Sequence, residues 1–320
     1  MFLRIQNLST YFFLDEGIIR AVDQISFDIN EQETVAIVGE SGCGKTLVAL
    51  SLLNLVPLPG RIVGGNIYFQ GKDLLKLDKR ELTQIRGKDI SMVFQEPGAA
   101  LNPVFTIGYQ IREVLRRHCA ISVHESKIEA VKLLGKVGIP EPEKRMKAYP
   151  YELSGGMKQR VVIAMAMGTH PKLLIADEPT SALDMTVQAD ILDLFGYLKE
   201  KYKMSILLIT HDLGIVSEIA QRVLVMYTGK LLESAPTEDL FRKPNHPYTI
   251  GLLNLIPRLG EGRKTSFHGI TGSVPDFFVL PSGCTFHPRC ALSDDSCTFR
   301  FPETVNISPN HSCACYKIIH

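Results

Sequence analysis

The sequence predicts an α/β fold built around a parallel sheet. Residues 34–38, 172–176 and 205–210 are short, nearly continuous apolar runs, which are typical of strands buried on both faces. Between the second and third runs, residues 187–202 (VQADILDLFGYLKEKY) have helical periodicity. A strand, a helix and another strand in this order indicate a crossover between parallel strands.

The first 30 residues predict an antiparallel β element ahead of this core. They contain two segments of β-type pattern, LRIQNLSTYFF and AVDQISFDI, with a turn at residues 15–17 (DEG) between them. Farther along, the apolar run LVALSLLNLV predicts a helix that the prolines at 57 and 59 end.

Two further regions are added to the core. Residues from about 96 to about 160 include helical patterns of mixed charge, such as IGYQIREVLRRH and SKIEAVKLLGKVG, and predict a helical insertion. From about residue 233 the chain is rich in Pro, Gly and Cys, which predicts an appended segment. We therefore expect one domain at residues 1–232 and a C-terminal extension at residues 233–320.

The composition excludes several classes of protein. Of the 320 residues, 45% are hydrophobic and 22% are charged, which is typical of a globular protein and not of a disordered or fibrous one. The 35 basic and 34 acidic side chains nearly balance, so we expect no general attraction to nucleic acid. No apolar run approaches the roughly 20 residues that span a bilayer. The first ten residues (MFLRIQNLST) lack the apolar region of a signal peptide, so we expect a cytoplasmic protein.

Residues 39–46 (GESGCGKT) fit the phosphate-loop pattern G-x-x-x-x-G-K-[ST] between a predicted strand and a predicted helix. Glycines let successive backbone N–H groups point at phosphates, with the positive end of the helix behind them. Lys45 would neutralise the β and γ oxygens of ATP, and the Thr46 hydroxyl would ligate Mg²⁺. The nucleotide-binding residues predicted in this loop are Gly39, Ser41, Gly42, Gly44, Lys45 and Thr46.

The predicted strand at 172–176 ends in two acids, Asp177 and Glu178. The ends of parallel strands lie where ligands bind, and adjacent strand residues point in opposite directions. We therefore expect Asp177 to help hold Mg²⁺ and Glu178 to orient the attacking water. An acidic pair that caps the following helix is the alternative interpretation.

Residues 153–160 (LSGGMKQR) closely resemble the signature sequence of the ABC ATPases. Ser154 is a good N-cap, and Gly155 and Gly156 expose backbone amides at a helix start, so this segment is a second predicted anion site. One chain cannot easily bring both anion sites to one γ-phosphate. The resemblance implies a RecA-like core and a head-to-tail dimer, in which each signature completes the ATP site of the other subunit.

Other segments follow the order of the ABC family. Gln95, in MVFQEP, resembles the Q-loop glutamine, which contacts the metal or water and couples to the membrane subunit. Residues 181–184 (SALD) resemble the D-loop, with Asp184 at its end, and His211, in LLITHDL, resembles the switch histidine that contacts the γ-phosphate. The resemblance thus implies catalytic roles for Glu178, His211 and Gln95. It implies a Mg²⁺ site made by Thr46, Gln95 and Asp177.

Phe12 aligns with the aromatic residue that stacks on adenine in ABC ATPases. Tyr11 and Phe13 flank it, and strand alternation places both of them on the opposite face, so either remains an alternative.

The resemblance covers nearly the whole chain and is closest to the ATPase subunits of dipeptide and oligopeptide importers. FQEPGAALNPVFTIGYQI, YPYELSGGMKQR and HPYT (residues 246–249) carry it. It implies ATP-driven solute uptake at the cytoplasmic face of the inner membrane, without nucleic acid. The implied partners are a second ATPase subunit, by the subfamily a paralogue, two transmembrane permease subunits and an extracytoplasmic solute-binding protein. Some nickel importers belong to the same group, so nickel is the alternative cargo.

Five of the seven cysteines lie in the last 37 residues, which in a reducing compartment indicates a metal site more than disulfides. Four thiolates bind either iron or zinc. The segments GCTFHPRC and HSCAC are similar to the cysteine motif of the peptide-importer ATPases, which holds a 4Fe–4S cluster. The ligands implied are Cys284, Cys290, Cys297 and Cys315, with Cys313 as the alternative fourth ligand. Zinc and unmetallated thiols are the alternative states.

Two rival functions use the same motifs. An ABC ATPase acting on DNA or ribosomes usually has a long coiled-coil insertion or two cassettes in one chain, and this sequence shows neither pattern. A non-catalytic, regulatory subunit is disfavoured because Glu178 and His211 are both present.

Overall fold

A computed structural model describes residues 2–181, 183–256 and 269–318. The chain divides into two compact units. Unit 1 contains residues 1–30, 34–75 and 209–320, and unit 2 contains residues 31–33 and 76–208.

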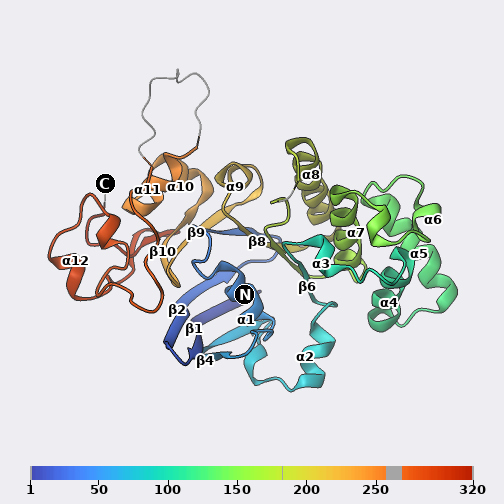
Figure 1. The fold of residues 1–320 in the computed structure, drawn as a ribbon, viewed down its shortest axis with the longest axis horizontal. Helices are drawn as coiled ribbons and strands as arrows, with labels where there is room; N and C mark the ends of the chain where they lie inside the picture. Colours follow the sequence, from blue (N-terminus) through green and yellow to red (C-terminus); the bar gives the residue numbers. More distant parts are fainter. Residues whose placement is uncertain (1, 182, 257–268, 319–320) are drawn as a thin grey trace. The chain divides into compact units, whose positions relative to one another are not determined.

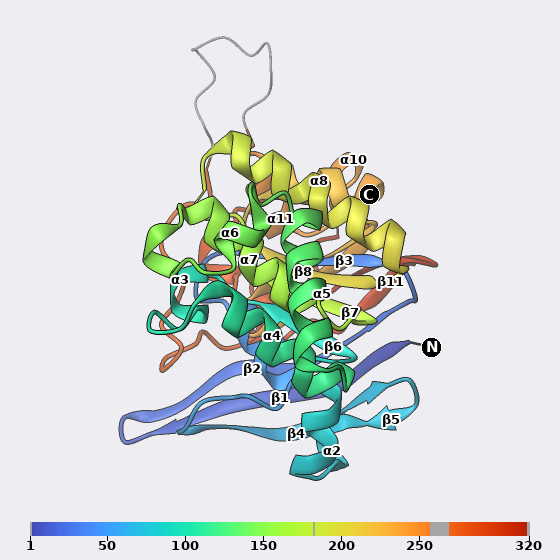
Figure 2. The same ribbon diagram turned by 90° about the vertical axis from the view of Figure 1, so that its right-hand side faces the viewer.

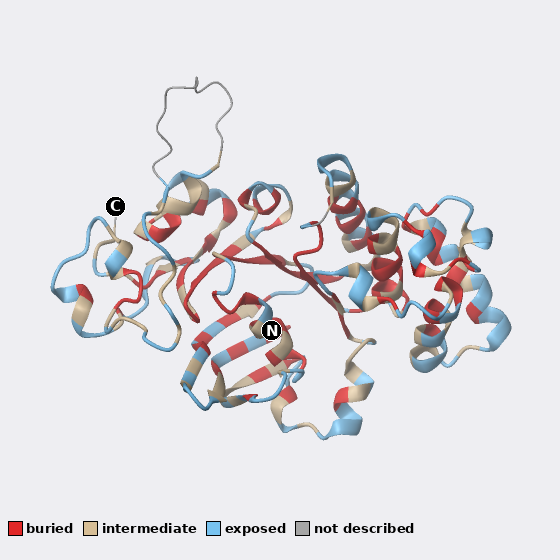
Figure 3. Ribbon diagram, viewed as in Figure 1, coloured by how far each residue is buried: buried red, intermediate tan, exposed pale blue. Residues whose placement is uncertain are grey.

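An antiparallel sheet forms the N-terminal part of unit 1 (Figures 1 and 2). Its strand order is β2-β1-β4-β5, and the bounds are Gly17–Ile29, Leu3–Leu14, Gly60–Phe69 and Lys72–Asp73. β1 and β2 are joined at residues 15–16, as predicted. Buried and exposed residues alternate along much of β1 and β2 (Figure 3), so one face of this sheet is buried and the other faces solvent.

A second set of strands in unit 1 contains the predicted strand at 34–38. β3 (Thr34–Val38) pairs in parallel with β9 (Arg222–Tyr227). On the other side of β9 the strands pair antiparallel, first with β10 (Lys230–Pro236) and then with β12 (His311–Cys313) and β11 (Val305–Ser308). The order from the edge is β11, β12, β10, β9 and β3. All five residues of β3 are buried, and each buried Val or Ile contributes about 1.5–3 kcal/mol to folding. The segment after residue 233 therefore adds strands to the sheet that holds β3.

The helices of unit 1 are short. The helix predicted over residues 47–56 begins earlier and ends earlier, because α1 spans Lys45–Leu52. It stops before the prolines because Asn54 takes a left-handed backbone conformation and its N–H bonds the carbonyl of Ser51. The others are α9 (Leu213–Ile219), α10 (Thr237–Arg242), α11 (Pro247–Leu253), α12 (Ser296–Phe299) and 3₁₀ turns at Leu74–Lys76 and His287–Arg289.

Unit 2 contains the predicted strand–helix–strand segment. β6 (Ile90–Val93) pairs in parallel with β7 (Leu173–Asp177), and β7 neighbours β8 (Ser205–Thr210), whose first four residues belong to this unit. β7 is displaced by one residue from the prediction and includes Asp177. α8 (Met185–Tyr202) connects β7 and β8, so the predicted crossover is confirmed.

The region from about 96 to about 160 is helical, as predicted. α4, α5 and α7 pack on one another, and capping boxes at Asp78 and Ser122 start α2 and α5. The helices of this region are α3 (Pro97–Ala100), α4 (Ile107–Cys119), α5 (Val123–Lys136), α6 (Pro142–Arg145), a 3₁₀ turn at Pro150–Glu152 and α7 (Gly155–Met167), and α2 (Lys79–Ile85) precedes it. Among the described residues, no helix combines the length and apolar character needed to cross a membrane.

Candidate nucleotide-binding site

The phosphate loop joins β3 to α1 and depends on glycine at fixed positions. Gly39 and Gly44 have φ of +155° and +104°. A Cβ at Gly39 would lie 2.1 Å from the Met226 carbonyl oxygen, and one at Gly44 would lie 2.1 Å from the Ala21 carbonyl oxygen. Gly42, with φ of +80°, is exposed, and a Cβ there would meet nothing within 4 Å. The loop is therefore closely packed at Gly39 and Gly44 and open to solvent at Gly42, where a phosphate would approach.

Lys45 lies folded over the loop. Its Nζ donates to the carbonyl oxygens of Gly39 at 2.7 Å and Glu40 at 3.1 Å, and the residue is 6% exposed. These acceptors are neutral, so phosphate oxygens would be stronger partners for the same ammonium group. Thr46 is exposed in the first turn of α1, and its role as a Mg²⁺ ligand stays a prediction.

Cys43 is packed beneath the loop. It is fully buried, and its N–H bonds the Glu40 carbonyl while its own carbonyl accepts from Gly229. Burial raises the pKa of this thiol, so it stays protonated and unreactive at neutral pH. It is a packing residue and not part of the predicted chemistry.

Glu40 ties the phosphate loop to the C-terminal extension, which sequence analysis did not foresee. The Glu40 carboxylate accepts two bonds from Arg289, at 2.7 and 3.1 Å, and its backbone N–H donates to the Tyr248 hydroxyl at 2.9 Å. Arg289 and Tyr248 belong to the segments HPRC and HPYT. Both segments carry the family resemblance, and nothing in the sequence pattern relates their Arg and Tyr to the phosphate loop.

Three aromatic residues of β1, Tyr11, Phe12 and Phe13, are half exposed. Among the contacts described, Phe12 differs from the other two because its ring has no polar or cationic partner. Its ring packs against Gly60, where an added Cβ would lie 2.7 Å from the ring. The Tyr11 hydroxyl instead donates to Asp23 at 2.8 Å, and the guanidinium of Arg61 lies 4.1 Å from the Phe13 ring centroid. These contacts favour Phe12 as the adenine-stacking residue, which remains a prediction.

The acids at the end of β7 have different backbone conformations. Asp177 is the last residue of the strand and is 2% exposed, whereas Glu178 lies just beyond it, with φ of +47°, and is 8% exposed. Strand alternation therefore does not apply to Glu178, because this residue lies past the strand in a left-handed backbone conformation, and the separate roles of the two acids stay predictions. The acids do not cap α8 either, because the N-cap is Asp184, whose Oδ1 accepts from Val187 N at 3.0 Å.

The signature segment begins α7. The Ser154 hydroxyl accepts from Met157 N at 3.3 Å, which confirms the predicted N-cap. A Cβ at Gly156 would lie 2.7 Å from Cγ1 of Val187, so the start of α7 packs closely on the start of α8. The structure thus brings the signature and Asp184 together within unit 2. Ala182 of the predicted D-loop lies outside the described residues.

The remaining predicted residues follow strand ends. Gln95 is exposed, two residues beyond β6. His211 is exposed, directly after β8, and the neighbouring Asp212 caps α9 through bonds from Gly214 N and Ile215 N.

The predicted residues divide between the two units. Unit 1 contains Phe12, the phosphate loop and His211, and unit 2 contains Gln95, the signature, Asp177, Glu178 and Asp184. Their convergence on one nucleotide stays a prediction.

The C-terminal cysteines lie near one another in unit 1. All seven cysteines of the chain are free thiols. Burial, and then the neighbouring thiols, raise the pKa of Cys284 and of Cys315 to about 11. Burial and Cys297 raise the pKa of Cys290 as well. In the part of the chain that the structure describes, no three His, Cys, Asp or Glu side chains form a preformed metal site.

Cys313 and Cys315 have different surroundings. Cys313 is fully buried in β12, and burial and the carboxylate of Glu233 raise its pKa. Cys315 is partly exposed, interacts electrostatically with Cys290 and Cys297, and accepts a bond from Lys317 N at 3.2 Å. Cys313 in turn interacts electrostatically with Cys284 and Cys315, so the choice of a fourth ligand between Cys313 and Cys315 stays a prediction.

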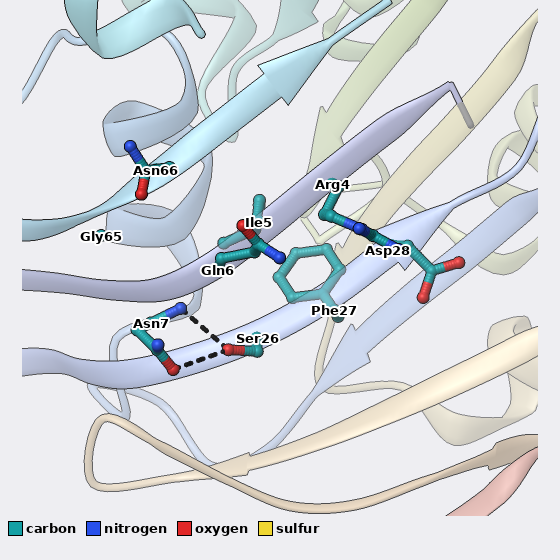
Figure 4. Close-up of a pocket in the computed structure, with 9 residues that line it drawn as sticks. All are labelled: Arg4, Ile5, Gln6, Asn7, Ser26, Phe27, Asp28, Gly65 and Asn66. Carbon is teal, nitrogen blue, oxygen red and sulfur yellow. Dashed lines mark hydrogen bonds between the residues drawn. The ribbon is translucent and has the colours of Figure 1, made fainter. Parts of the chain in front are cut away.

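A hollow of about 660 Å³ lies on the N-terminal sheet, and none of the predicted nucleotide-binding residues lines it (Figure 4). It occurs where β1 bulges: Asn7 has φ of +48°, and the pairing registers shift between Ile5 and Leu8. Ser26 accepts from Asn7 N at 2.8 Å and donates to Asn7 Oδ1 at 3.1 Å. The hollow follows from the bulge and includes none of the predicted site residues.

A buried strand, a glycine-rich loop with its lysine, and a helix together define a P-loop nucleotide-binding protein. Comparison with known proteins narrows this class. Residues 22–181 match the model of the family described as ABC transporter, and residues 232–297 match the oligopeptide/dipeptide transporter, C-terminal region.

Curated relatives match along almost their full length. The oligopeptide transport ATP-binding protein AppD of Bacillus subtilis is 49% identical, over 98% of this chain and 96% of that protein. The dipeptide transport ATP-binding protein DppD of B. subtilis is 46% identical, over 98% and 93%. The oligopeptide transport ATP-binding protein OppD of Salmonella typhimurium is 45% identical, over the same shares.

Solved structures show the same fold. The dimeric bacterial ABC transporter cassette MJ0796 aligns with a TM-score of 0.67 at 28% identity, over 73% of this chain and 98% of that one. The chain therefore belongs to the ABC transporter family, within its oligopeptide/dipeptide transporter group. It is an ATP-binding subunit of an ABC importer, and it has the cassette fold predicted from its sequence.

Proposed function

We propose that this subunit hydrolyses ATP to drive the uptake of dipeptides or oligopeptides across the cytoplasmic membrane. As an ABC importer subunit it is an ATPase coupled to transport. The single observation that carries the peptide assignment is the match of residues 232–297 to the oligopeptide/dipeptide transporter C-terminal region. We propose 232/233 as the boundary between the cassette and this extension, and its residues 257–268 and 319–320 lie outside the described residues. A nickel cargo is the alternative within the same group.

The proposed ATP site combines an aromatic side chain, the phosphate loop and three oxygen donors for Mg²⁺. Phe12 would stack on adenine. The loop amides and Lys45, whose present acceptors are neutral carbonyls, would hold the β- and γ-phosphates. Thr46, Asp177 and Gln95 supply hydroxyl, carboxylate and amide oxygens, which are the hard donors that Mg²⁺ prefers. When bound, Mg²⁺ neutralises charge on the phosphates.

Hydrolysis would need Glu178 and His211 near the γ-phosphate. The left-handed backbone at Glu178 is a strained conformation, and such strain is concentrated at functional sites. Glu178 would accept a proton from, or orient, the attacking water, and His211 would contact the γ-phosphate.

The signature requires a second subunit in this proposal. Ser154, Gly155 and Gly156 present a capped helix start, and Asp184 caps the adjacent helix. We propose that these groups face the nucleotide of a second ATP-binding subunit, a paralogue of this chain, in a head-to-tail dimer. The dimer would act on two permease subunits through the surface around Gln95, with an extracytoplasmic solute-binding protein delivering the peptide. The subunit would lie peripherally on the cytoplasmic face of the membrane.

We further propose that Cys284, Cys290, Cys297 and Cys315 hold a 4Fe–4S cluster that fastens the extension. The support is the proximity of these free, partly buried thiols and the N–H bond to the Cys315 sulfur. Anaerobic reconstitution with iron and sulfide should give the visible absorption of a cluster. Cys315→Ser should lose it and Cys313→Ser should keep it. Zinc found in the purified chain in place of iron would support the alternative metal.

Transport assays test the main proposal. The subunit, assembled with the permease and ATPase subunits encoded beside it, should take up peptides into proteoliposomes at the expense of ATP. Glu178→Gln should keep ATP binding while losing about 10²–10⁴ in turnover, the range for a lost general base. Full hydrolysis by Glu178→Gln would remove the catalytic assignment. Uptake of Ni²⁺ and not of peptides would replace the peptide assignment by nickel.

A further inference from the structure

Every N–H group of the Arg289 guanidinium donates a hydrogen bond, and two of these bonds go to Glu40 of the phosphate loop. Its side chain is 5% exposed. Nε donates to the Thr271 carbonyl at 2.9 Å, Nη2 to the Gly272 carbonyl at 3.3 Å, and Nη1 to the Tyr227 hydroxyl at 3.3 Å. The remaining fork closes on both carboxylate oxygens of Glu40. A guanidinium fixed on three sides is pre-organised for this bidentate pair.

A second connection reaches the backbone of the same loop residue. Tyr248 is fully buried, and its ring packs against Tyr227 and Phe286, with centroids 4.7 and 5.2 Å away. Its hydroxyl accepts the Glu40 N–H. Glu40 is thus held at its side chain by one segment of the extension and at its backbone by another.

The Tyr248 segment is itself anchored to the chain's C-terminal strands. Buried Glu233 accepts from the backbone N–H groups of Asn245 and His246, at 2.7 and 3.0 Å, and its Oε1 lies 2.7 Å from Nε2 of His311 in β12. His246 then accepts the N–H of Tyr248 at 3.0 Å. The contacts run without a gap from β12 to the phosphate loop.

The charge of Glu40 explains why this contact matters for a nucleotide. Glu40 is the second residue of a loop proposed to bind polyphosphate, and an unpaired carboxylate there would repel the phosphates. Arg289 neutralises that carboxylate. The guanidinium donates to both carboxylate oxygens, so the two opposite charges are held in direct contact.

We propose that Arg289 is a positioning residue for the nucleotide site, through which the C-terminal extension sets the nucleotide affinity of the phosphate loop. This inference rests on the proposed function of the loop. It holds whether or not the neighbouring thiols bind metal, because the contacts to Glu40 involve no cysteine side chain. By reciprocity, nucleotide binding must order the extension by the same factor.

Titration of the full-length chain with the magnesium complex of the non-hydrolysable analogue AMP-PNP tests the proposal. Arg289→Gln should weaken binding about tenfold, a coupling of usual size for linked sites. Adding Glu40→Gln should restore most of the affinity, because the carboxylate that needed neutralisation is gone. The matched control is Arg300→Gln in the same extension, since the Arg300–Glu303 ion pair is exposed, and this variant should bind like the wild type.

Hydrogen exchange provides a readout independent of affinity. AMP-PNP should slow amide exchange at residues 284–290 in the wild type and in Arg300→Gln, but not in Arg289→Gln. Wild-type affinity in Arg289→Gln, or a double variant as weak as Arg289→Gln alone, overturns the proposal. If the wild type and Lys45→Ala both fail to bind AMP-PNP, the proposed function of the loop is what fails.

Discussion

The starts of α1 and α7 are both predicted to contact phosphate, yet they are built differently. The loop before α1 has three glycines with positive φ, no side-chain cap, a lysine, and two connections to the C-terminal extension. The start of α7 is a regular helix capped by Ser154, and neither of its glycines has positive φ. The first is an irregular loop in conformations that glycine alone adopts readily, and the C-terminal extension holds it at Glu40. The second is an ordinary capped helix, whose function depends on where a partner meets it.

Replacing one glycine of each helix start by alanine should give the largest difference in folding stability between the two segments. At Gly44, the Cβ would lie 2.1 Å from a backbone carbonyl at φ of +104°, so Gly44→Ala should destabilise folding by at least about 3 kcal/mol. At Gly156, the Cβ would lie 2.7 Å from Cγ1 of Val187, an overpacking cost of about 1–3 kcal/mol that the gain in helix propensity of about 1 kcal/mol partly offsets. Gly156→Ala should therefore destabilise the chain by less than about 2 kcal/mol in urea unfolding. Equal losses would contradict the comparison.

Removing a lysine from each segment comes next in size. Lys45→Ala should weaken nucleotide binding about 100-fold, the effect of losing a charged hydrogen-bond donor to phosphate. Lys158→Ala, in the first turns of α7, should leave the affinity of the isolated chain unchanged, because the signature is proposed to act on a partner's nucleotide. Calorimetric titration measures both. A comparable loss in Lys158→Ala would place the signature on the chain's own nucleotide.

Acid should weaken the anchor behind the phosphate loop. Burial lowers the pKa of His246 to about 3, from 6.5 when unfolded. Between these values the unfolded chain binds a proton that the folded chain does not, so stability is full above pH 6.5 and falls as the pH decreases. The loss is about 2 kcal/mol by pH 5.

The matched variant for this prediction is His246→Asn. Its side-chain oxygen can still accept the Tyr248 N–H and cap α11, but it does not titrate. The difference in unfolding free energy between wild type and variant should therefore change by about 2 kcal/mol between pH 7.5 and pH 5, to the disadvantage of the wild type. A difference that is independent of pH would refute the assignment.

Ser154→Ala gives the smallest expected effect. It removes one capping bond and should cost about 1 kcal/mol of stability, while nucleotide binding by the isolated chain stays unchanged. ATP turnover in the assembled complex should fall, because the hydroxyl is proposed to face the partner's nucleotide. Unaltered turnover would leave Ser154 a cap and nothing more.

The sequence predicted the features that depend on local pattern. A continuous apolar run located β3, helical periodicity located the α8 crossover and the helical insertion, and motif spacing located the glycines whose positive φ the structure displays. The end of α1 was misplaced because a left-handed Asn54 stops it before any proline. The left-handed backbone of Glu178 was not predicted either, since nothing in the pattern distinguishes a strand residue from one just past the strand end.

The contacts of Glu40 could not be predicted from the sequence. Glu40 and Arg289 are 249 positions apart, and no periodicity relates them. Such a pair becomes visible only when the fold brings two distant segments to one loop.

The close packing of α7 on α8 has a mechanical consequence. Gly156 leaves no gap beside Val187, and Arg160 bonds both Asp190 at 2.9 Å and the Val137 carbonyl at 2.7 Å. The two helix caps, Ser154 and Asp184, are thereby fastened to one rigid block. A rotation of that block would displace both caps together, so neither could respond to a neighbouring subunit without moving the other.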